Sequence, residues 1–223
     1  MAVKDEAATL ERVLKRVLDV DWPVALELVI VDDGSTDASP EILRRVDDER
    51  VTVITHPVNR GKGAAIRTAA AHATGDYVVM CDADLEYAPE EIPRLLDPVI
   101  VGEATVVFGT RSFTANSAYS FWYVVGNKGV TFAANVLFNA WISDLETCFK
   151  LMPLALYRDL DVRAPGFGME AEITGKLLGR GIRPYEVPIS YRARTREQGK
   201  KLTWRDGVDA LRILLRERLR ARR

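Results

Sequence analysis

The chain has 223 residues, of which 48% are hydrophobic, which is enough for one sizeable core, and we expect a single domain over residues 1–223. The formal net charge of -1 excludes the strongly basic class of nucleic-acid binders, so no nucleic-acid partner is expected. Two cysteines, Cys81 and Cys148, are too few for a disulfide framework or a zinc site. Because the first residues do not form a signal peptide, we expect the protein in the cytoplasm or at the cytoplasmic face of a membrane.

Hydrophobic spacing predicts alternating helices and strands over the first 110 residues. Leu10, Val13, Leu14 and Val17 recur at helical spacing, and "LELVIV" is typical of a strand buried on both faces. The chain continues with a turn and a helix near Pro40, the strand "VTVIT", the helix "AAIRTAAAHA" and the strand "DYVVMC". This alternation with short connections favours an α/β fold with a mostly parallel central sheet flanked by helices.

The later elements alternate less regularly. Residues 117–142 are predicted to be helical, and the apolar run within them is interrupted by polar residues such as Asn127 and Lys128, which favours an interfacial or core helix over a bilayer span. We also predict a helix closed by Gly181 and a final amphipathic helix, for which Thr203 and Asp206 resemble a capping box. The remaining predicted strands are "ATVVFG", "TCFKLM" and the proline-broken edge strand "IRPYEVPISY".

Asp82 and Asp84 follow the strand "DYVVMC" directly. If the backbone stays extended, side chains two apart point the same way, and both carboxylates face one pocket. A hard divalent cation, Mg²⁺ or Mn²⁺, would join such carboxylates and share its coordination with substrate phosphates. The alternative is that one aspartate only caps the proline-initiated helix that follows. Position favours the metal site, because ligands bind beyond the carboxyl ends of strands in open α/β sheets.

Two further polar loops follow predicted strands. "DDGSTD" is compatible with an Asx-type turn and a helix cap, which leaves Asp32 and Asp33 available to bind a nucleobase or ribose. "NRGKG" lacks the spacing of a phosphate-binding loop, but it precedes a helix N-terminus, where Arg60 and Lys62 would favour an anion.

Six segments in this order resemble inverting family-two glycosyltransferases of the GT-A fold, and most closely the polyprenyl-phosphate (dolichol-phosphate) mannose synthase-like branch. The segments are "VDDGSTD", "NRGKGAA", "TGDYVVMCDADLEYAPEEI", "DLETCFKLM", "GMEAEIT" and "GKKLTWRDG", and the match covers nearly the whole chain. The resemblance implies a nucleotide-sugar-binding half at residues 1–110, an acceptor-side half at 111–203 and a basic C-terminal helix at 204–223.

The resemblance also implies residue roles. Asp84 would be the principal ligand of Mg²⁺ or Mn²⁺ and thereby catalytic, with Asp82 and Glu86 beside it. Glu6 and Asp33 would lie near the nucleotide of a GDP- or UDP-hexose donor. The residues that suit an acceptor phosphate are Arg111, Lys128, Arg196 and Lys200.

Three functions stay open. The first is transfer of a hexose to a polyprenyl phosphate, which is already anionic and could attack without a general base. The second is transfer to a hydroxyl of a glycan or small molecule, with Asp144 or Glu146 as the base. The third is a non-catalytic paralogue, because the first strand of the family is missing or shortened here and Ala2, Lys4 and Asp5 replace the usual residues.

The basic C-terminal helix also has two interpretations. It is either a solvated helix docked by its leucines or an interfacial element that makes a peripheral membrane contact, with arginines facing anionic lipid.

Overall fold

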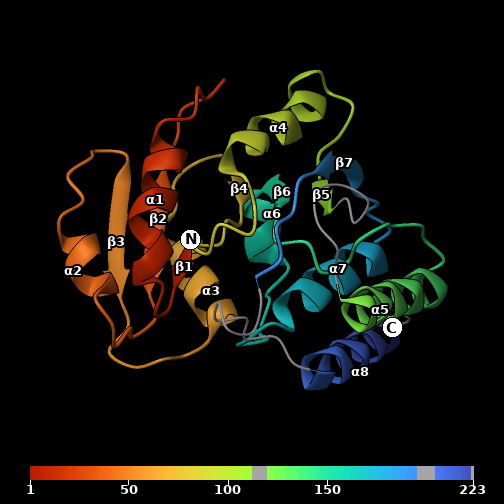
Figure 1. Ribbon diagram of the computed structural model, residues 1–223. Coiled ribbons are helices and arrows are strands. Elements are labelled where there is room, and N and C mark those ends of the chain that lie inside the picture. Colours follow the sequence, from red (N-terminus) through yellow and green to blue (C-terminus); the bar gives the residue numbers. More distant parts are fainter. Residues whose placement is uncertain (112–119, 195–203, 222–223) are drawn as a thin grey trace.

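The computed structural model describes residues 1–111, 120–194 and 204–221. Its strands form two sheets (Figure 1). The first sheet has the order β1-β2-β3 and is parallel throughout, with strands β1 (Ala2–Val3), β2 (Leu28–Asp32) and β3 (Val51–Thr55). The second has the order β4-β6-β5-β7, with strands β4 (Tyr77–Val79), β5 (Val107–Arg111), β6 (Lys150–Pro153) and β7 (Tyr185–Ile189).

The shortened first strand joins the two sheets. β1 has only two residues, yet it pairs with β2, and Ala2 also bridges to Asp82 beyond the end of β4 in the parallel sense. Within the second sheet, β6 runs antiparallel to both β4 and β5, whereas β7 pairs parallel to β5 at the sheet edge. The mostly parallel α/β fold and the edge position of the proline-containing strand are therefore as predicted.

Helices cover the sheets and form a separate group beside them. α1 (Ala7–Leu18) buries the four predicted apolar residues, and α3 (Lys62–His72) packs on β2. The predicted helix over 117–142 is observed as α5 (Phe121–Phe138), and Thr203 of the suggested capping box lies outside the described residues. The other helices are α2 (Ser39–Arg44), η1 (Pro89–Glu91), α4 (Ile92–Ile100), α6 (Leu154–Asp159), α7 (Met169–Gly179) and α8 (Trp204–Arg220).

The core has a large and a small part. The large cluster lies between the sheets and their covering helices and includes Ile30, Leu95 and Phe108. The small cluster joins α5, α7 and α8, which lie together to one side of the strands in Figure 1. The described residues contain no helix that is both long and apolar enough to cross a bilayer.

Candidate active site

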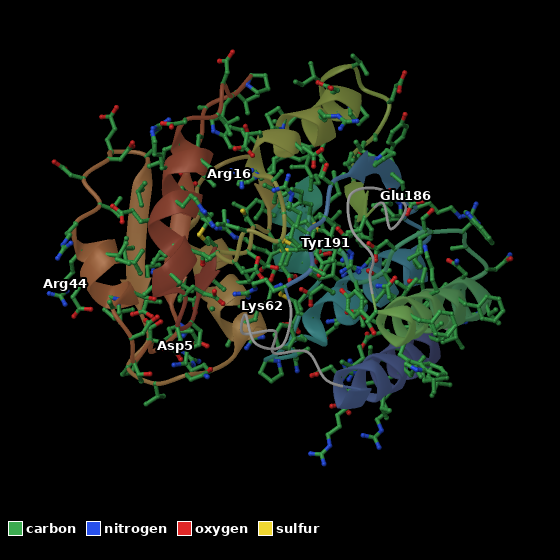
Figure 2. The ribbon with its side chains drawn as sticks, in the orientation of Figure 1. Asp5, Arg16, Arg44, Lys62, Glu186 and Tyr191 are labelled. Atoms are coloured by element: carbon green, nitrogen blue, oxygen red, sulfur yellow. The ribbon has the colours of Figure 1, made fainter. Side chains whose placement is uncertain are left out.

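A cavity of about 240 Å³ opens where β1, β2 and β4 end. Residues from distant parts of the chain meet there because the carboxyl ends of parallel strands share one edge of the sheet. Lys62 and Tyr191, which both line the cavity, are labelled near the middle of Figure 2. The predicted site residues that line it are Glu6, Asp33, Lys62, Asp82, Asp84, Glu86, Arg111 and Glu146.

The first aspartate of the pair is bound to a lysine. The Lys62 Nζ lies 2.9 Å from Asp82 Oδ1 and 2.8 Å from Glu170 Oε1. Burial opposes the charge on Lys62, but Asp82 and Glu170 outweigh it and raise the pKa of Lys62 well above its ordinary value. Lys62 is thus a fixed cation in the cavity lining, paired with two carboxylates, and the predicted binding of an anion near the start of α3 stays a prediction.

The second aspartate faces an arginine that the sequence analysis did not identify. Arg194 Nη2 lies 3.0 Å from Asp84 Oδ2, and Arg194 Nη1 lies 2.8 Å from Glu6 Oε2. Glu86 also approaches, with 3.9 Å between Arg194 Nε and Glu86 Oε1. Burial, followed by repulsion from Asp82 and Glu86, raises the pKa of Asp84 to about 7, although Arg194 acts in the opposite direction.

Asp33 organises the loop that borders the cavity. It accepts hydrogen bonds from the backbone N–H groups of Arg60 and Gly61 at 2.9 and 2.7 Å, and His56 Nδ1 lies 2.7 Å from Asp33 Oδ1. The loop also passes close to the segment around Ala164, since a Cβ on Gly63 would lie 2.1 Å from the Ala164 carbonyl oxygen. The glycines of "NRGKG" therefore have a packing role here.

Asp144 and Glu146, the two candidate bases, have different environments. Asp144 is 1% exposed and accepts hydrogen bonds from Arg111 Nε and Nη2 at 2.6 and 2.7 Å. Burial opposes its ionisation, but Arg111 and Asn127 keep the pKa of Asp144 below its ordinary value. Glu146 lines the cavity, and burial together with Glu170 raises the pKa of Glu146 to about 7. Of the two, Glu146 has the exposure to the cavity and the proton affinity that a general base needs.

Four of the predicted site residues lie elsewhere. Asp32 is buried and accepts a hydrogen bond from the Ser35 backbone N–H, so it closes the predicted Asx-type turn instead of facing the cavity. Asp144 pairs with Arg111 behind the cavity wall. Arg60 and Lys128 are exposed and do not line the cavity, and Arg196 and Lys200 are outside the described residues.

Arg194 and Glu170 are among the cavity residues that the sequence analysis missed. Arg194 had no signal of its own beside Arg192 and Arg196, because only long-range packing distinguishes these arginines. Glu170 belongs to "GMEAEIT", a segment that contributed to the family resemblance without a role for any of its residues. Its Oε2 is buried and has no hydrogen-bond partner among the described residues.

The charges of the cavity suit an added cation. Seven acidic and four basic side chains line the cavity, so the fully ionised cavity is negative. A nucleotide diphosphate is also an anion, and a cation bound between the two would reduce their repulsion. No three acidic, cysteine or histidine side chains of the described residues are arranged to hold a metal ion, and Lys62 and Arg194 already pair with Asp82 and Asp84. Carboxylate oxygens are nevertheless the ligands that Mg²⁺ and Mn²⁺ prefer.

Known proteins resemble the chain in sequence. The low-salt glycan biosynthesis hexosyltransferase Agl6 of Haloferax volcanii is 30% identical over 190 residues, which are 84% of this chain and 45% of that protein. An undecaprenyl-phosphate 4-deoxy-4-formamido-L-arabinose transferase of Pseudomonas aeruginosa is 37% identical over 125 residues, which are 54% of this chain and 37% of that protein. The chain therefore spans less than half the length of these two relatives.

The fold is that of solved glycosyltransferases. Glucosyl-3-phosphoglycerate synthase from Mycobacterium tuberculosis, in a complex with uridine diphosphate, superposes with a TM-score of 0.72 and 21% sequence identity, over 99% of this chain and 77% of that one. Another structure of that enzyme contains Mn²⁺, uridine diphosphate and glucosyl-3-phosphoglycerate and gives a TM-score of 0.69. The sequence model described as Glycosyl transferase family 2 matches residues 1–160, and the chain belongs to that family of glycosyltransferases, with the GT-A fold that its sequence predicts.

Proposed function

We propose that the chain is the catalytic domain of an inverting, metal-dependent hexosyltransferase that transfers a sugar from a nucleotide diphosphate to a polyprenyl phosphate. The observation that carries this proposal is the shared cavity of Asp82 and Asp84 with Lys62 beyond the carboxyl ends of three strands. The branch of the family agrees, since one relative is named an undecaprenyl-phosphate transferase. The donor is a UDP- or GDP-hexose, and the fold neighbours that contain uridine diphosphate favour UDP.

The nucleotide and the diphosphate of the donor are assigned to different residues of the cavity. Asp82, Asp84 and Glu86 would hold Mg²⁺ or Mn²⁺, and the ion, when bound, stabilises charge on the departing diphosphate. Lys62 adds a fixed positive charge at the same place. Glu6 and Asp33 border the nucleotide side, where Asp33 acts mainly by holding the Arg60–Gly61 backbone in position.

Acceptor binding is assigned to the opposite side of the cavity. Arg111 lines the cavity while its guanidinium is held by Asp144, so its charge is fixed in place. Arg196 and Lys200 follow Arg194 in the chain and are proposed to complete the binding of an acceptor phosphate. A polyprenyl phosphate would bring the enzyme to a membrane surface.

A hydroxyl acceptor is the second candidate, and the position of Glu146 favours it. Glu146 faces the cavity with its pKa raised to about 7, so its carboxylate could take a proton from an attacking hydroxyl near neutral pH. Under the leading proposal the acceptor phosphate is already ionised, and Glu146 instead accepts a hydrogen bond from the sugar. Glu170 Oε2, which lacks a partner among the described residues, offers a second acceptor of this kind.

Turnover with radiolabelled UDP-glucose and GDP-mannose tests the proposal. Each donor is incubated with Mn²⁺ and either a short polyprenyl phosphate or the corresponding polyprenol, so that the two acceptors differ only in the phosphate. Label in the phosphate product alone supports the leading proposal, and label in the polyprenol product alone supports the hydroxyl candidate. If neither product is labelled, and calorimetry with UDP, GDP and Mn²⁺ gives no metal-dependent heat, the chain is a non-catalytic paralogue.

A further inference from the structure

The outer side of α5 is apolar along its whole length. Trp122, Phe132 and Val136 are 77%, 67% and 64% exposed, and Val125 is also exposed. Val125, Phe132 and Val136 follow Trp122 by 3, 10 and 14 positions. This spacing places the four residues on one side of the helix over about 20 Å. Trp141 follows the helix and is 84% exposed.

The opposite side of α5 is buried, and it carries the polar residues Asn127 and Thr131 beside apolar ones. Val130 and Ala134 pack in the small core cluster with α7 and α8. Between Phe121 and Trp141 the sequence contains no acidic residue and one charged residue, Lys128. A contiguous exposed apolar surface marks a site that interacts with protein or lipid.

α8 continues the apolar surface. Leu211, Leu215 and Leu219 are exposed and recur every four residues, whereas Ala210 and Leu214 are buried against α5 and α7. The Arg218 guanidinium lies 6.0 Å from the centre of the Phe138 ring, so the flank of α8 that carries Arg218 faces α5. At 3.6 residues per turn, Leu211 and Leu215 lie beside Arg218 on the solvent side of that flank.

Figure 1 shows α5 and α8 side by side, and buried residues of the two helices pack together in the small cluster. We name this surface the α5–α8 face. Its residues are Phe121, Trp122, Val125, Phe132, Val136, Trp141, Leu211, Leu215 and Leu219.

Basic residues flank this face. The side chains of Arg212 and Arg220 are 75% and 60% exposed, and α8 carries five arginines against three acidic residues. The acidic residues are partly engaged inside the helix, since Asp209 pairs with Arg212 and the buried Glu217 pairs with Arg216 and Arg220. The border of the α5–α8 face is therefore positive although the whole chain has a net charge of -1.

We propose that the α5–α8 face docks onto the surface of an anionic lipid bilayer. Tryptophan and phenylalanine would lie at the level of the headgroups, and the arginines of α8 would contact lipid phosphates. A second copy of the chain fits less well, because two-fold pairing of one patch with itself would bring the arginines of α8 close to those of the other copy.

The face also leads to the candidate active site. Arg111 lines the cavity, and its Nη1 donates a 2.9 Å hydrogen bond to the hydroxyl of Tyr123 in the first turn of α5. Docking of this turn would bring the acceptor side of the cavity to the membrane surface, where the phosphate of a polyprenyl lipid lies. This last step rests on the proposed function, whereas docking itself does not.

Vesicle sedimentation tests the docking surface. The wild-type chain should sediment with vesicles of phosphatidylcholine and phosphatidylglycerol and less with phosphatidylcholine alone. The double substitution Trp122→Ser and Phe132→Ser should lower the partition coefficient by about tenfold or more, since both side chains lose their apolar contact with lipid. The matched control is Ile100→Ser with Val101→Ser, which removes two residues of 59% and 68% exposure at the C-terminal end of α4 and should leave partition within about twofold.

A charge substitution on α8 measures how much electrostatic attraction contributes to vesicle binding. Arg212→Glu should weaken binding to the anionic vesicles and leave binding to phosphatidylcholine unchanged, and Arg44→Glu, at a site of similar exposure on α2, is its control. The proposal is overturned if wild type stays in the supernatant with anionic vesicles, or if the Trp122 and Phe132 variant sediments like wild type. A wild-type dimer that this variant converts to a monomer would identify a second copy as the occupant and would also overturn it.

The outcome is independent of the proposed reaction. Turnover with a short, water-soluble acceptor should stay at the wild-type rate in the Trp122 and Phe132 variant, because neither residue lines the cavity. Loss of vesicle binding with unchanged turnover supports docking by this face. Vesicle binding without any turnover contradicts the proposed function and leaves the docking surface standing.

Discussion

Arg194 and Asp84 form an ion pair of 3.0 Å inside the candidate site, although 110 residues separate them in the chain. The same guanidinium contacts Glu6 at 2.8 Å, so one arginine pairs with two of the carboxylates around the proposed metal. A divalent ion that binds Asp84 must therefore compete with Arg194.

We expect Arg194→Ala to bind Mn²⁺ about tenfold more tightly than wild type in the absence of nucleotide, because the competing cation is gone. Titration followed by electron paramagnetic resonance of free Mn²⁺ measures this affinity without turnover. Arg192→Ala is the control, since Arg192 is exposed two residues earlier and does not line the cavity. Equal or weaker binding by the Arg194 variant would show that the arginine and the ion do not share a site.

Asp84→Asn should reduce turnover by about a hundredfold or more, because it removes the charge that would hold the metal beside the diphosphate. Asp97→Asn on α4 is the matched control, since this aspartate is exposed and lies outside the cavity. Initial rates at saturating donor and Mn²⁺ measure the effect. A variant within about twofold of wild type would contradict the metal assignment.

Glu146→Gln distinguishes the two acceptor chemistries. With a lipid phosphate no base is needed, so the variant should keep its rate within about tenfold and show the same pH profile as wild type. With a hydroxyl acceptor, the raised pKa of Glu146 predicts a rate that falls below about pH 7 as the carboxylate gains its proton. The Gln variant would then lose about a hundredfold or more. Rates from pH 5.5 to 8.5 with each acceptor decide between them.

The buried Arg111–Asp144 pair is expected to stabilise the fold. Asp144→Asn should lower the free energy of unfolding by about 3 kcal/mol, because it leaves the Arg111 charge buried with a weaker partner. The pKa of Asp144 is lowered in the folded state, so its contribution is complete above the unfolded value of about 4 and is lost as pH falls through the folded value. Urea unfolding at pH 7 and pH 3.5 should show a smaller difference between variant and wild type at the lower pH. A constant difference would rule out this linkage.

Gly63→Ala should destabilise the chain by more than about 1 kcal/mol, because its Cβ would lie 2.1 Å from the Ala164 carbonyl oxygen and force the start of α3 away from the segment around Ala164. Gly126→Ala on α5 meets nothing within 4 Å and should instead stabilise the chain by up to about 1 kcal/mol through helix propensity. Thermal unfolding of the two variants beside wild type measures both effects. Equal effects of the two substitutions would contradict the close approach at Gly63.

Local patterns in the sequence predicted most of the fold. The spacing of Leu10, Val13, Leu14 and Val17 defined α1, and the continuous run before Asp32 defined the buried strand β2. Prolines near β7 indicated an edge strand, which the sheet order confirms. The antiparallel direction of β6 had no such signal, because strand direction depends on the path of the chain between strands rather than on the residues within one.

Some residues around the cavity were likewise predictable from the local sequence, and others were not. Asp82 and Asp84 were predicted as a pair because strand periodicity and position at a strand end are properties of the adjacent sequence. That Glu146 faces the cavity while Asp144 is bound to Arg111 could not be read from "SDLETC", where both carboxylates are equally plausible.

The sequence by itself determined the family, the α/β layers and the acidic strand end at Asp82 and Asp84, since short-range spacing encodes each of them. Only the tertiary structure decided that Lys62 neutralises Asp82, that Arg194 reaches Asp84 and Glu6, and that the outer sides of α5 and α8 lie together. The physical reason is that electrostatic and packing partners are chosen by distance in space, and the folded chain brings together groups that no local pattern relates.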